Sequence, residues 1–293
     1  MPRRSRDTGS SNTYRFFVAP ASIQEGRVRL SDPALAHQLG GVLRLSRGDR
    51  VTLLDGEGWQ YVVALEQVER RGAVVGVVER REPAEGAEPR AQLTLYLPLI
   101  RPERFEWALQ KGVELGAAAF VPTSCAHSVT EGGPAARKLE RWRAIVREAA
   151  EQSRRGRLPR LEPPIPFAEA CARAAGTRAF LLWEGAGAAG LRAALRALLA
   201  DADERPTTDD QARGVRASDP ADVLPAFTRQ NSSLVIGPWS ILSGPEGGLA
   251  EDERRAAATH GIIAVTLGPR TLRAETAPIV AAAALLYELG ELE

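Results

Sequence analysis

Cysteine is scarce in this chain, and so are lysine, methionine and long apolar runs. Only two of its 293 residues are cysteines, Cys125 and Cys171, and their spacing fits neither a CxxC motif nor a zinc site. A disulfide framework and a structural metal are therefore not expected, and a reducing cytoplasm is the expected compartment. No apolar run approaches the roughly 18 residues that a membrane-spanning helix needs. The polar, basic start MPRRSRDTGSSN lacks the apolar segment of a secretory signal.

Charge of neither sign is in excess overall, but it is unevenly spread. The net charge is +1, whereas residues 101–160 carry 12 basic and 7 acidic side chains and residues 161–293 carry 12 and 18. A basic middle is a mild indication of a polyanionic partner, and a solvated helix face explains it equally well. Arginine supplies nearly all the positive charge, which can reflect genome composition and does not by itself indicate RNA binding.

The chain is long enough for about two domains. Residues 14–82 contain short β-branched and aromatic runs separated by turn signals, which predict a small β-barrel. Residues 83–91 have prolines and charges and predict a linker, and residues 1–13 predict a disordered tail.

From residue 92 strands alternate with helices, which predicts an α/β fold with a mostly parallel sheet over 92–293. The helix predicted near 134–153 places Trp142, Val146 and Ala149 on one face. Residues 201–232 are polar and poor in large apolar side chains, and they predict a disordered insertion.

Two glycine-containing stretches each follow a predicted strand and precede a helix. They read LSGPEGGLAEDE (242–253) and LGPRTLRAETA (267–277). Ligands bind α/β sheets at the carboxyl ends of strands. Neither stretch has the GxxxxGK[ST] or GxGxxG pattern, so a flat, partly apolar ligand is a better fit than a phosphate loop.

Other polar residues leave two interpretations open. The loop with Arg270, Arg273 and Glu275 is either an ordinary exposed loop with a helix cap or a site of chemistry. The basic end of the long helix, EAAEQSRRGRLPR, either caps that helix or contacts phosphate. His37, His127 and His260 are far apart in sequence and are expected to be structural or exposed.

Taken together, these motifs resemble one family closely, the ribosomal RNA small subunit methyltransferase E family of the SPOUT class. SGPEGGLAEDE and LGPRTLRAETAPI look like its two signature loops. YRFFV, HQLGGVLRLSRGDRVTLLDGEG, RFEWALQKGVELGAAAFVPTSCAHSV and RWRAIVREAAEQSRRGRLPRLEPP support the match in the same order.

The resemblance implies a PUA-like β-barrel followed by an α/β domain with a deep trefoil knot. It also implies a homodimer that uses S-adenosyl-L-methionine, without a metal, to methylate N3 of one uridine in small-subunit (16S) ribosomal RNA. The partner would be that RNA or the assembled small subunit.

Carried over position by position, the resemblance implies a cofactor pocket at the ends of three strands. Its residues would be Leu182, Trp183, Glu184, Ser243, Gly244, Pro245, Gly247, Gly248, Leu267, Gly268, Arg270, Leu272, Thr276 and Ala277. Trp183 departs from the family pattern, and its large ring would narrow the pocket or stack against it.

The resemblance also implies roles in the reaction. N3 of uridine must lose its proton to become a good nucleophile, and the base must first leave any stack. Arg273 would stabilise the uridine anion, and Glu275 or Glu246 would be the base or an orienting group. The expected RNA-binding residues are Arg15, Arg44, Arg47, Arg154, Arg155 and Arg157.

Two alternatives stay open. A SPOUT relative that methylates ribose 2′-OH or another base would share the two loops, but not the YRFFV and EAAEQSRR segments. A non-catalytic RNA-binding assembly factor would not need intact GPEGG and LRAETA loops.

Overall fold

The chain forms two compact units, which we describe separately. The computed structural model describes residues 14–69, 72–84, 88–128, 136–185, 187–203 and 237–292. Unit 1 takes the described residues within 1–88, 109–120 and 134–162, and unit 2 takes the others. The units therefore interleave along the chain, whereas the sequence analysis expected one boundary at 83–91. The predicted tail, 1–13, lies outside the described residues.

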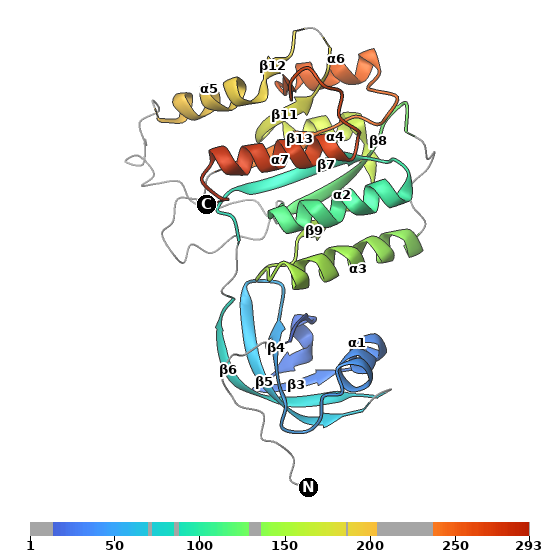
Figure 1. The fold of residues 1–293 in the computed structure, drawn as a ribbon, viewed down its shortest axis with the longest axis vertical. Helices are drawn as coiled ribbons and strands as arrows, with labels where there is room; N and C mark the ends of the chain where they lie inside the picture. Colours follow the sequence, from blue (N-terminus) through green and yellow to red (C-terminus); the bar gives the residue numbers. More distant parts are fainter. Residues whose placement is uncertain are drawn as a thin grey trace, which may run out of the picture. The chain divides into compact units, whose positions relative to one another are not determined.

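Unit 1 contains a six-stranded sheet (Figure 1). Its strands are β1 (Arg15–Phe17), β2 (Ile23–Gln24), β3 (Arg27–Leu30), β4 (Arg50–Leu54), β5 (Trp59–Val68) and β6 (Val74–Pro83). Their order is β1-β4-β5-β6-β3-β2, with β1 parallel to β4 and the other pairs antiparallel. The 3-10 turn η1 (Pro20–Ser22), helix α1 (Pro33–His37) and the π-helical turn η2 (Gln38–Val42) lie between strands. These strands match the β-rich runs predicted over 14–82.

Helix α3 (Ala136–Gln152) also belongs to unit 1 and confirms the helix predicted near 134–153. Its buried face carries Trp142, which is 1% exposed, with Val146 and Ala149. Burying one such large apolar side chain stabilises a fold by about 1.5–3 kcal/mol. Beyond the helix, the short strand β9 (Arg160–Leu161) pairs in parallel with the start of β8 (Ala119–Ser124).

Helix α3 ends in a Schellman motif. The N–H of Arg155 donates to the carbonyl of Ala150 at 2.9 Å, and the N–H of Arg154 donates to that of Glu151 at 3.3 Å. Arg154 has a φ of 58°, the left-handed conformation that this position requires and that glycine usually supplies.

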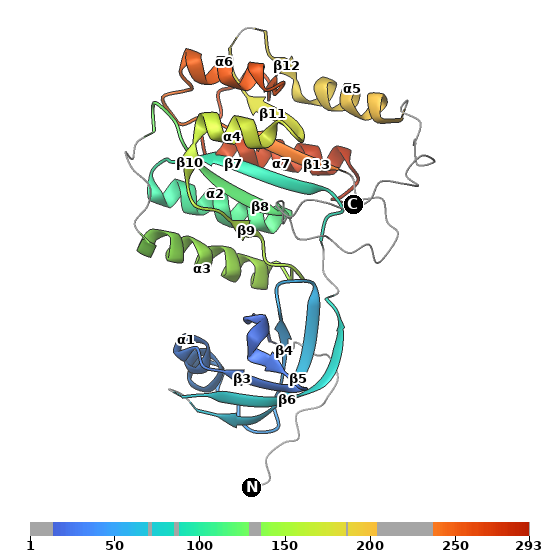
Figure 2. The same cartoon turned by 180° about the vertical axis from the view of Figure 1, so that it is seen from behind.

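Unit 2 is a three-layer α/β structure. Its strands are β7 (Gln92–Pro98), β10 (Ile165–Pro166), β11 (Arg178–Leu182), β12 (Ala189–Gly190), β13 (Pro238–Leu242) and β14 (Ile263–Thr266), together with most of β8. Its helices are α4 (Phe167–Ala174), α5 (Leu191–Asp203), α6 (Glu251–Thr259) and α7 (Thr276–Glu288), and α2 (Pro102–Leu115) begins in it. Helices α5 and α7 lie on one face of the sheet, and α4 and α6 lie on the other (Figure 2).

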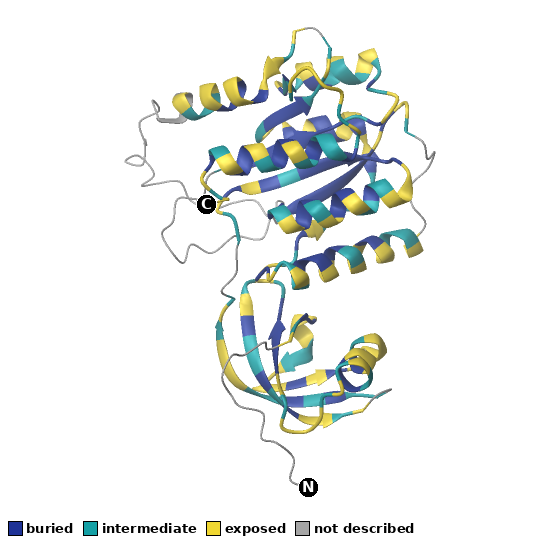
Figure 3. Ribbon diagram, viewed as in Figure 1, coloured by how far each residue is buried: buried dark blue, intermediate teal, exposed yellow. Residues whose placement is uncertain are grey.

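The strands of unit 2 follow the order β10-β8-β7-β13-β11-β14-β12. The pairs formed by β13 with β7, and by β11 with β13 and β14, are parallel. This confirms the predicted α/β class with a largely parallel sheet. The central strands are buried on both faces (Figure 3), because helices cover both sides of a parallel sheet.

The first three residues of the predicted insertion, 201–232, are helical. Helix α5 continues through Asp203, because the helical pattern of GLRAALRALLA extends into the first residues of 201–232. The rest of that segment lies outside the described residues.

Candidate active site

Three adjacent strands bring three loops to one edge of the unit 2 sheet. Strand β11 lies between β13 and β14, and because all three are parallel their carboxyl ends meet at the same edge. The loops that follow them, around 182–185, 243–249 and 265–274, enclose a cavity of about 630 Å³. The sequence analysis expected a ligand at this edge, and the structure places a cavity there.

Most of the predicted cofactor residues line this cavity. They are Leu182, Trp183, Glu184, Ser243, Gly244, Pro245, Gly248, Leu267, Gly268, Arg270, Leu272 and Ala277. Gly247 and Thr276 do not line it. Lining residues that the sequence analysis did not name are Gly185, Leu249, Val265, Thr266, Thr271 and Ala274, each within two positions of a predicted residue. Thr271 donates to Glu184 at 3.2 Å and so links two of the loops.

The glycines of SGPEGG are required by the conformation and packing of their own loop. Gly248 has a φ of 75° and closes a turn by donating to the carbonyl of Pro245 at 2.9 Å. A Cβ on Gly247 would lie 2.8 Å from Cβ of His127, and one on Gly244 would lie 2.9 Å from Cγ of Leu249. Turn geometry and close packing against the chain's own side chains therefore account for much of this glycine density.

Two residues that the sequence analysis did not assign to the site support the same loop. Nδ1 of His127 lies 3.2 Å from the carbonyl oxygen of Gly248. The carboxylate of Glu253 accepts hydrogen bonds from the N–H of Ala126 at 2.8 Å and from the N–H of Ala250 at 2.9 Å. These contacts tie the end of β8 to the start of α6 across the glycine loop. The contact with Ala126 has no local signal in the sequence, because Ala126 and Glu253 are 127 positions apart.

A single cation joins the two carboxylates that the sequence analysis offered as alternatives. Nη1 of Arg104, on α2, lies 3.0 Å from Glu246, and its Nε lies 3.7 Å from Glu275. Glu275 is 8% exposed, does not line the cavity, and has one oxygen with no hydrogen-bond partner in the described part of the chain. Glu246 and Arg273 are exposed and line the cavity. Only Glu246 and Arg273 of the three predicted catalytic residues therefore face the cavity directly.

Trp183 forms part of the cavity wall and is half-buried. The guanidinium of Arg254 lies 4.6 Å from its ring centroid, a cation–π distance. Its indole packs so closely on Gly185 that a Cβ there would overlap the ring nitrogen. The ring is thus held in place by an arginine of α6 and by the absence of a side chain at 185.

The predicted RNA-binding arginines lie in unit 1. Arg44, Arg47, Arg154 and Arg157 are exposed, and Arg15 is half-buried. Arg44 and Arg154 both have positive φ, 54° and 58°.

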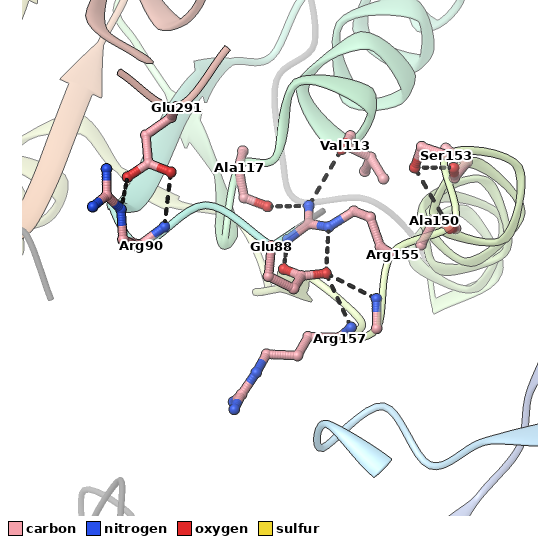
Figure 4. A network of polar contacts seen from close by, with 11 residues as sticks. Glu88, Arg90, Val113, Ala117, Ala150, Ser153, Arg155, Arg157 and Glu291 are labelled. Carbon is pink, nitrogen blue, oxygen red and sulfur yellow. Dashed lines mark hydrogen bonds and ion pairs between the residues drawn. The ribbon is translucent and has the colours of Figure 1, made fainter. Parts of the chain in front are cut away.

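The prediction for Arg155 is wrong, because its guanidinium is buried among internal partners (Figure 4). Its Nε and Nη2 lie 3.1 and 2.7 Å from the two oxygens of Glu88, and its Nη1 donates to the carbonyls of Ala117 at 2.6 Å and Val113 at 3.3 Å. At 3% side-chain exposure it has no surface to offer a phosphate. Four arginines close together in sequence suggested one basic surface, but the Schellman turn directs their side chains differently.

The two cysteines are buried in unit 2 and form no disulfide with a described residue. Burial raises the pKa of Cys125 to about 12 and that of Cys171 to about 11, which leaves both thiols protonated near neutral pH. In the described part of the chain, no group of three or more His, Cys, Asp or Glu side chains is arranged to hold a metal ion. Within the same residues, no helix is both long and apolar enough to span a bilayer.

Comparison with known proteins gives one consistent result. A family model described as an RNA methyltransferase domain matches residues 87–286. Ribosomal RNA small subunit methyltransferase E of Synechocystis sp. is 33% identical over 271 residues, which cover 92% of this chain and 76% of the relative. Its namesake in Bacillus subtilis is 30% identical over 255 residues, which cover 86% and 87%.

A solved structure agrees with these relatives. The crystal structure of a ribosomal RNA small subunit methyltransferase E from Neisseria gonorrhoeae, bound to S-adenosyl methionine, matches with a TM-score of 0.70 and 25% identity. The match covers 94% of this chain and 98% of that one.

Proposed function

Because the chain belongs to the ribosomal RNA small subunit methyltransferase E family, we propose that it methylates N3 of one uridine in small-subunit ribosomal RNA. The chain shares the family's activity class, which is S-adenosylmethionine-dependent methylation of small-subunit ribosomal RNA. The observation that carries the proposal is the cavity enclosed by the SGPEGG and LGPRTLRAETA loops at the ends of β13 and β14.

The cavity suits S-adenosylmethionine in size and lining. Its volume of about 630 Å³ lies within the range of roughly 300–1,000 Å³ usual for small-ligand sites. Leu182, Leu267 and Leu272 supply apolar walls, while the loop backbone at Gly244 and Gly248 supplies polar groups for the adenosyl and methionine parts. When bound, the cofactor supplies an already activated methyl group, so methyl transfer does not require a metal ion.

We assign the proton transfer and charge stabilisation to residues that face the cavity. Arg273 lines the cavity and would stabilise the uridine anion that forms when N3 loses its proton. Glu246 lines the cavity as well and is the better placed base. Glu275 is buried behind the lining beside Arg104, which fits the orienting role.

The finer features of architecture are also proposals. We infer a trefoil knot in unit 2, supported by the insertion of β13 between the earlier strands β7 and β11 and by β14 on the far side of β11. We infer that the unit 1 sheet is a PUA-like, RNA-binding barrel, with Arg44, Arg47, Arg154, Arg157 and Arg15 as phosphate contacts. The expected cytoplasmic location agrees with a ribosomal substrate.

We also infer a homodimer that uses α7. Val280 and Tyr287 on this helix are 41% and 63% exposed, and together they present apolar surface that a partner can cover. A cavity of about 500 Å³ lies beside them, between α5 and α7. Sedimentation velocity is expected to give a dimer, and a Tyr287→Glu variant is expected to dissociate. A wild-type chain that stays monomeric at micromolar concentration would contradict this inference.

One assay tests the reaction. Purified protein is incubated with small ribosomal subunits and labelled S-adenosylmethionine, and the modified nucleoside is mapped. We expect label at N3 of a uridine. Label on ribose or on another base would refute the proposal and favour a different SPOUT activity. Cofactor binding without any transfer would favour a non-catalytic assembly factor.

Two variants separate catalysis from cofactor binding. Arg273→Ala is expected to lower turnover about a hundredfold or more, with little change in cofactor affinity, because a cation aimed at developing charge acts mainly in the transition state. The matched control is Arg270→Ala, which removes a charge from the same cavity wall and is expected to weaken cofactor binding more than turnover. Unchanged turnover in Arg273→Ala would remove this residue from the mechanism.

A further inference from the structure

A second cavity lies within unit 1, between the sheet and the end of α3, and its charges are unevenly paired. It has a volume of about 1,020 Å³. Arg50 in its lining pairs with Glu79 at 2.7 Å, and Arg80 pairs with Glu82 at 2.9 Å. The remaining lining cations are Arg15 and Arg154, and neither forms an ion pair with a described residue.

Arg15 is an unusual cation for its surroundings. Its Nε and Nη2 are buried and have no hydrogen-bond acceptor among the described residues. Burial lowers the pKa of Arg15, and the positive charge of Arg154 lowers it further. A guanidinium normally satisfies its donors when it is buried, since unmade hydrogen bonds to a charged group are costly. The unmet donors and the neighbouring like charge both favour occupation of the cavity by an anion.

The nearby carboxylate does not supply that anion. Glu151 lines the same cavity, but one of its oxygens accepts the backbone N–H of Phe17 at 2.9 Å. Burial raises the pKa of Glu151, which weakens it further as a counter-charge. The two arginines therefore face the cavity with no committed negative partner in the described part of unit 1.

Arg154 adds a second, independent observation. It occupies the left-handed position of the Schellman motif that ends α3, where glycine would fit without strain. A non-glycine residue in this conformation is strained, and such strain is often found where the side chain has a functional role. Here the strained residue lines the cavity and acts electrostatically on Arg15.

We propose that Arg15 and Arg154 together bind one backbone phosphate of the RNA substrate. This proposal rests on the proposed function for its choice of RNA. Two guanidiniums present forked donors that match phosphate oxygens, and Gln38 and Gln152 in the same lining add amide donors. Tyr14, which is 43% exposed, also lines the cavity and offers a ring on which an unpaired base can stack. A site for free phosphate would not need this aromatic neighbour.

The test measures binding of a short single-stranded, uridine-containing RNA to the full chain at several salt concentrations. Arg15→Gln and Arg154→Gly are each expected to weaken binding about tenfold, as for loss of a charge-assisted contact. Each is also expected to reduce the slope of log affinity against log salt concentration by about 0.7, the value for one lost contact to single-stranded RNA. The matched control is Arg50→Gln, which removes a paired cation from the same cavity and is expected to change affinity less than about threefold.

Arg154→Gly supplies a readout that a purely structural arginine would not give. Glycine relieves the left-handed strain, so this variant is expected to melt at a higher temperature while binding RNA more weakly. Unchanged affinity and salt slope in both variants would overturn the proposal, as would an equal loss in Arg50→Gln. Tight binding of inorganic phosphate that does not compete with RNA would also overturn it. Because the assay needs no methyl transfer, its failure is distinguishable from failure of the proposed reaction.

Discussion

Replacing Arg155 by methionine removes the charge at the centre of a buried network and keeps an unbranched apolar stem (Figure 4). The change deprives the half-buried carboxylate of Glu88 of its cation and deprives the carbonyl of Ala117 of a donor at 2.6 Å. Loss of one partner from a buried ion pair costs about 3–5 kcal/mol. Glu88 keeps the N–H groups of Gly156 and Arg157, at 3.0 and 3.1 Å. We therefore expect a loss near the lower limit, about 3 kcal/mol.

Urea unfolding measures this loss, with hydrogen exchange of the α3 amides as a second probe of unit 1. The control is Arg27→Met in the same unit, whose pair with Glu66 has side chains 65% and 42% exposed. Such a pair contributes about 0–1 kcal/mol. The double variant Arg155→Met/Glu88→Gln is expected to recover part of the loss, because it no longer leaves a buried carboxylate unpaired.

Two results would refute this reasoning. A destabilisation below about 1 kcal/mol would mean that the pair behaves as a surface contact. A folded Arg155→Met variant with reduced RNA affinity would return Arg155 to the nucleic-acid interface. We expect its RNA affinity to stay within about twofold, in contrast to that of Arg154→Gly.

The remaining predictions concern unit 2. Gly185→Ala is expected to displace the indole of Trp183 and to weaken cofactor binding about tenfold, as measured by calorimetry. Adding Trp183→Leu is expected to restore part of the affinity. Wild-type affinity in Gly185→Ala would disprove this coupling. Glu253→Ala leaves two backbone N–H groups without their acceptor. It is therefore expected to destabilise the protein by about 1–3 kcal/mol and to weaken cofactor binding. A melting temperature equal to that of the wild type would contradict this prediction. Because the folded pKa values of Cys125 and Cys171, about 12 and 11, exceed the ordinary value of 9.0, their contribution to stability is complete below pH 9 and is lost as the pH rises towards 12. Neither thiol should react with iodoacetamide at pH 9 without urea, and rapid labelling of the native protein would show that the thiols are not buried.

Local pattern predicted the elements and the place of the site. The apolar alternation of β7 and the 3.6-residue period of α3 are properties of neighbouring residues, so they could be read directly. The two glycine loops each follow a strand, and parallel strands deliver their carboxyl ends to one edge. That rule is why most of the expected cofactor residues line one cavity. The RNA-binding prediction for Arg155 failed because Arg154 and Arg157 beside it are exposed, whereas its own guanidinium is buried.

The sequence by itself determined the fold class, many of the helices and strands, and the two glycine loops, because backbone preference and apolar periodicity act between residues close in the chain. Only the tertiary structure decided which charged side chains are paired and which are not. Arg104 meets Glu246 across 142 positions and Arg155 meets Glu88 across 67, and no local signal specifies such partners. The energy of a charged group depends on its burial and its nearest counter-charge. The structure alone could therefore distinguish the satisfied Arg155 from the unsatisfied Arg15.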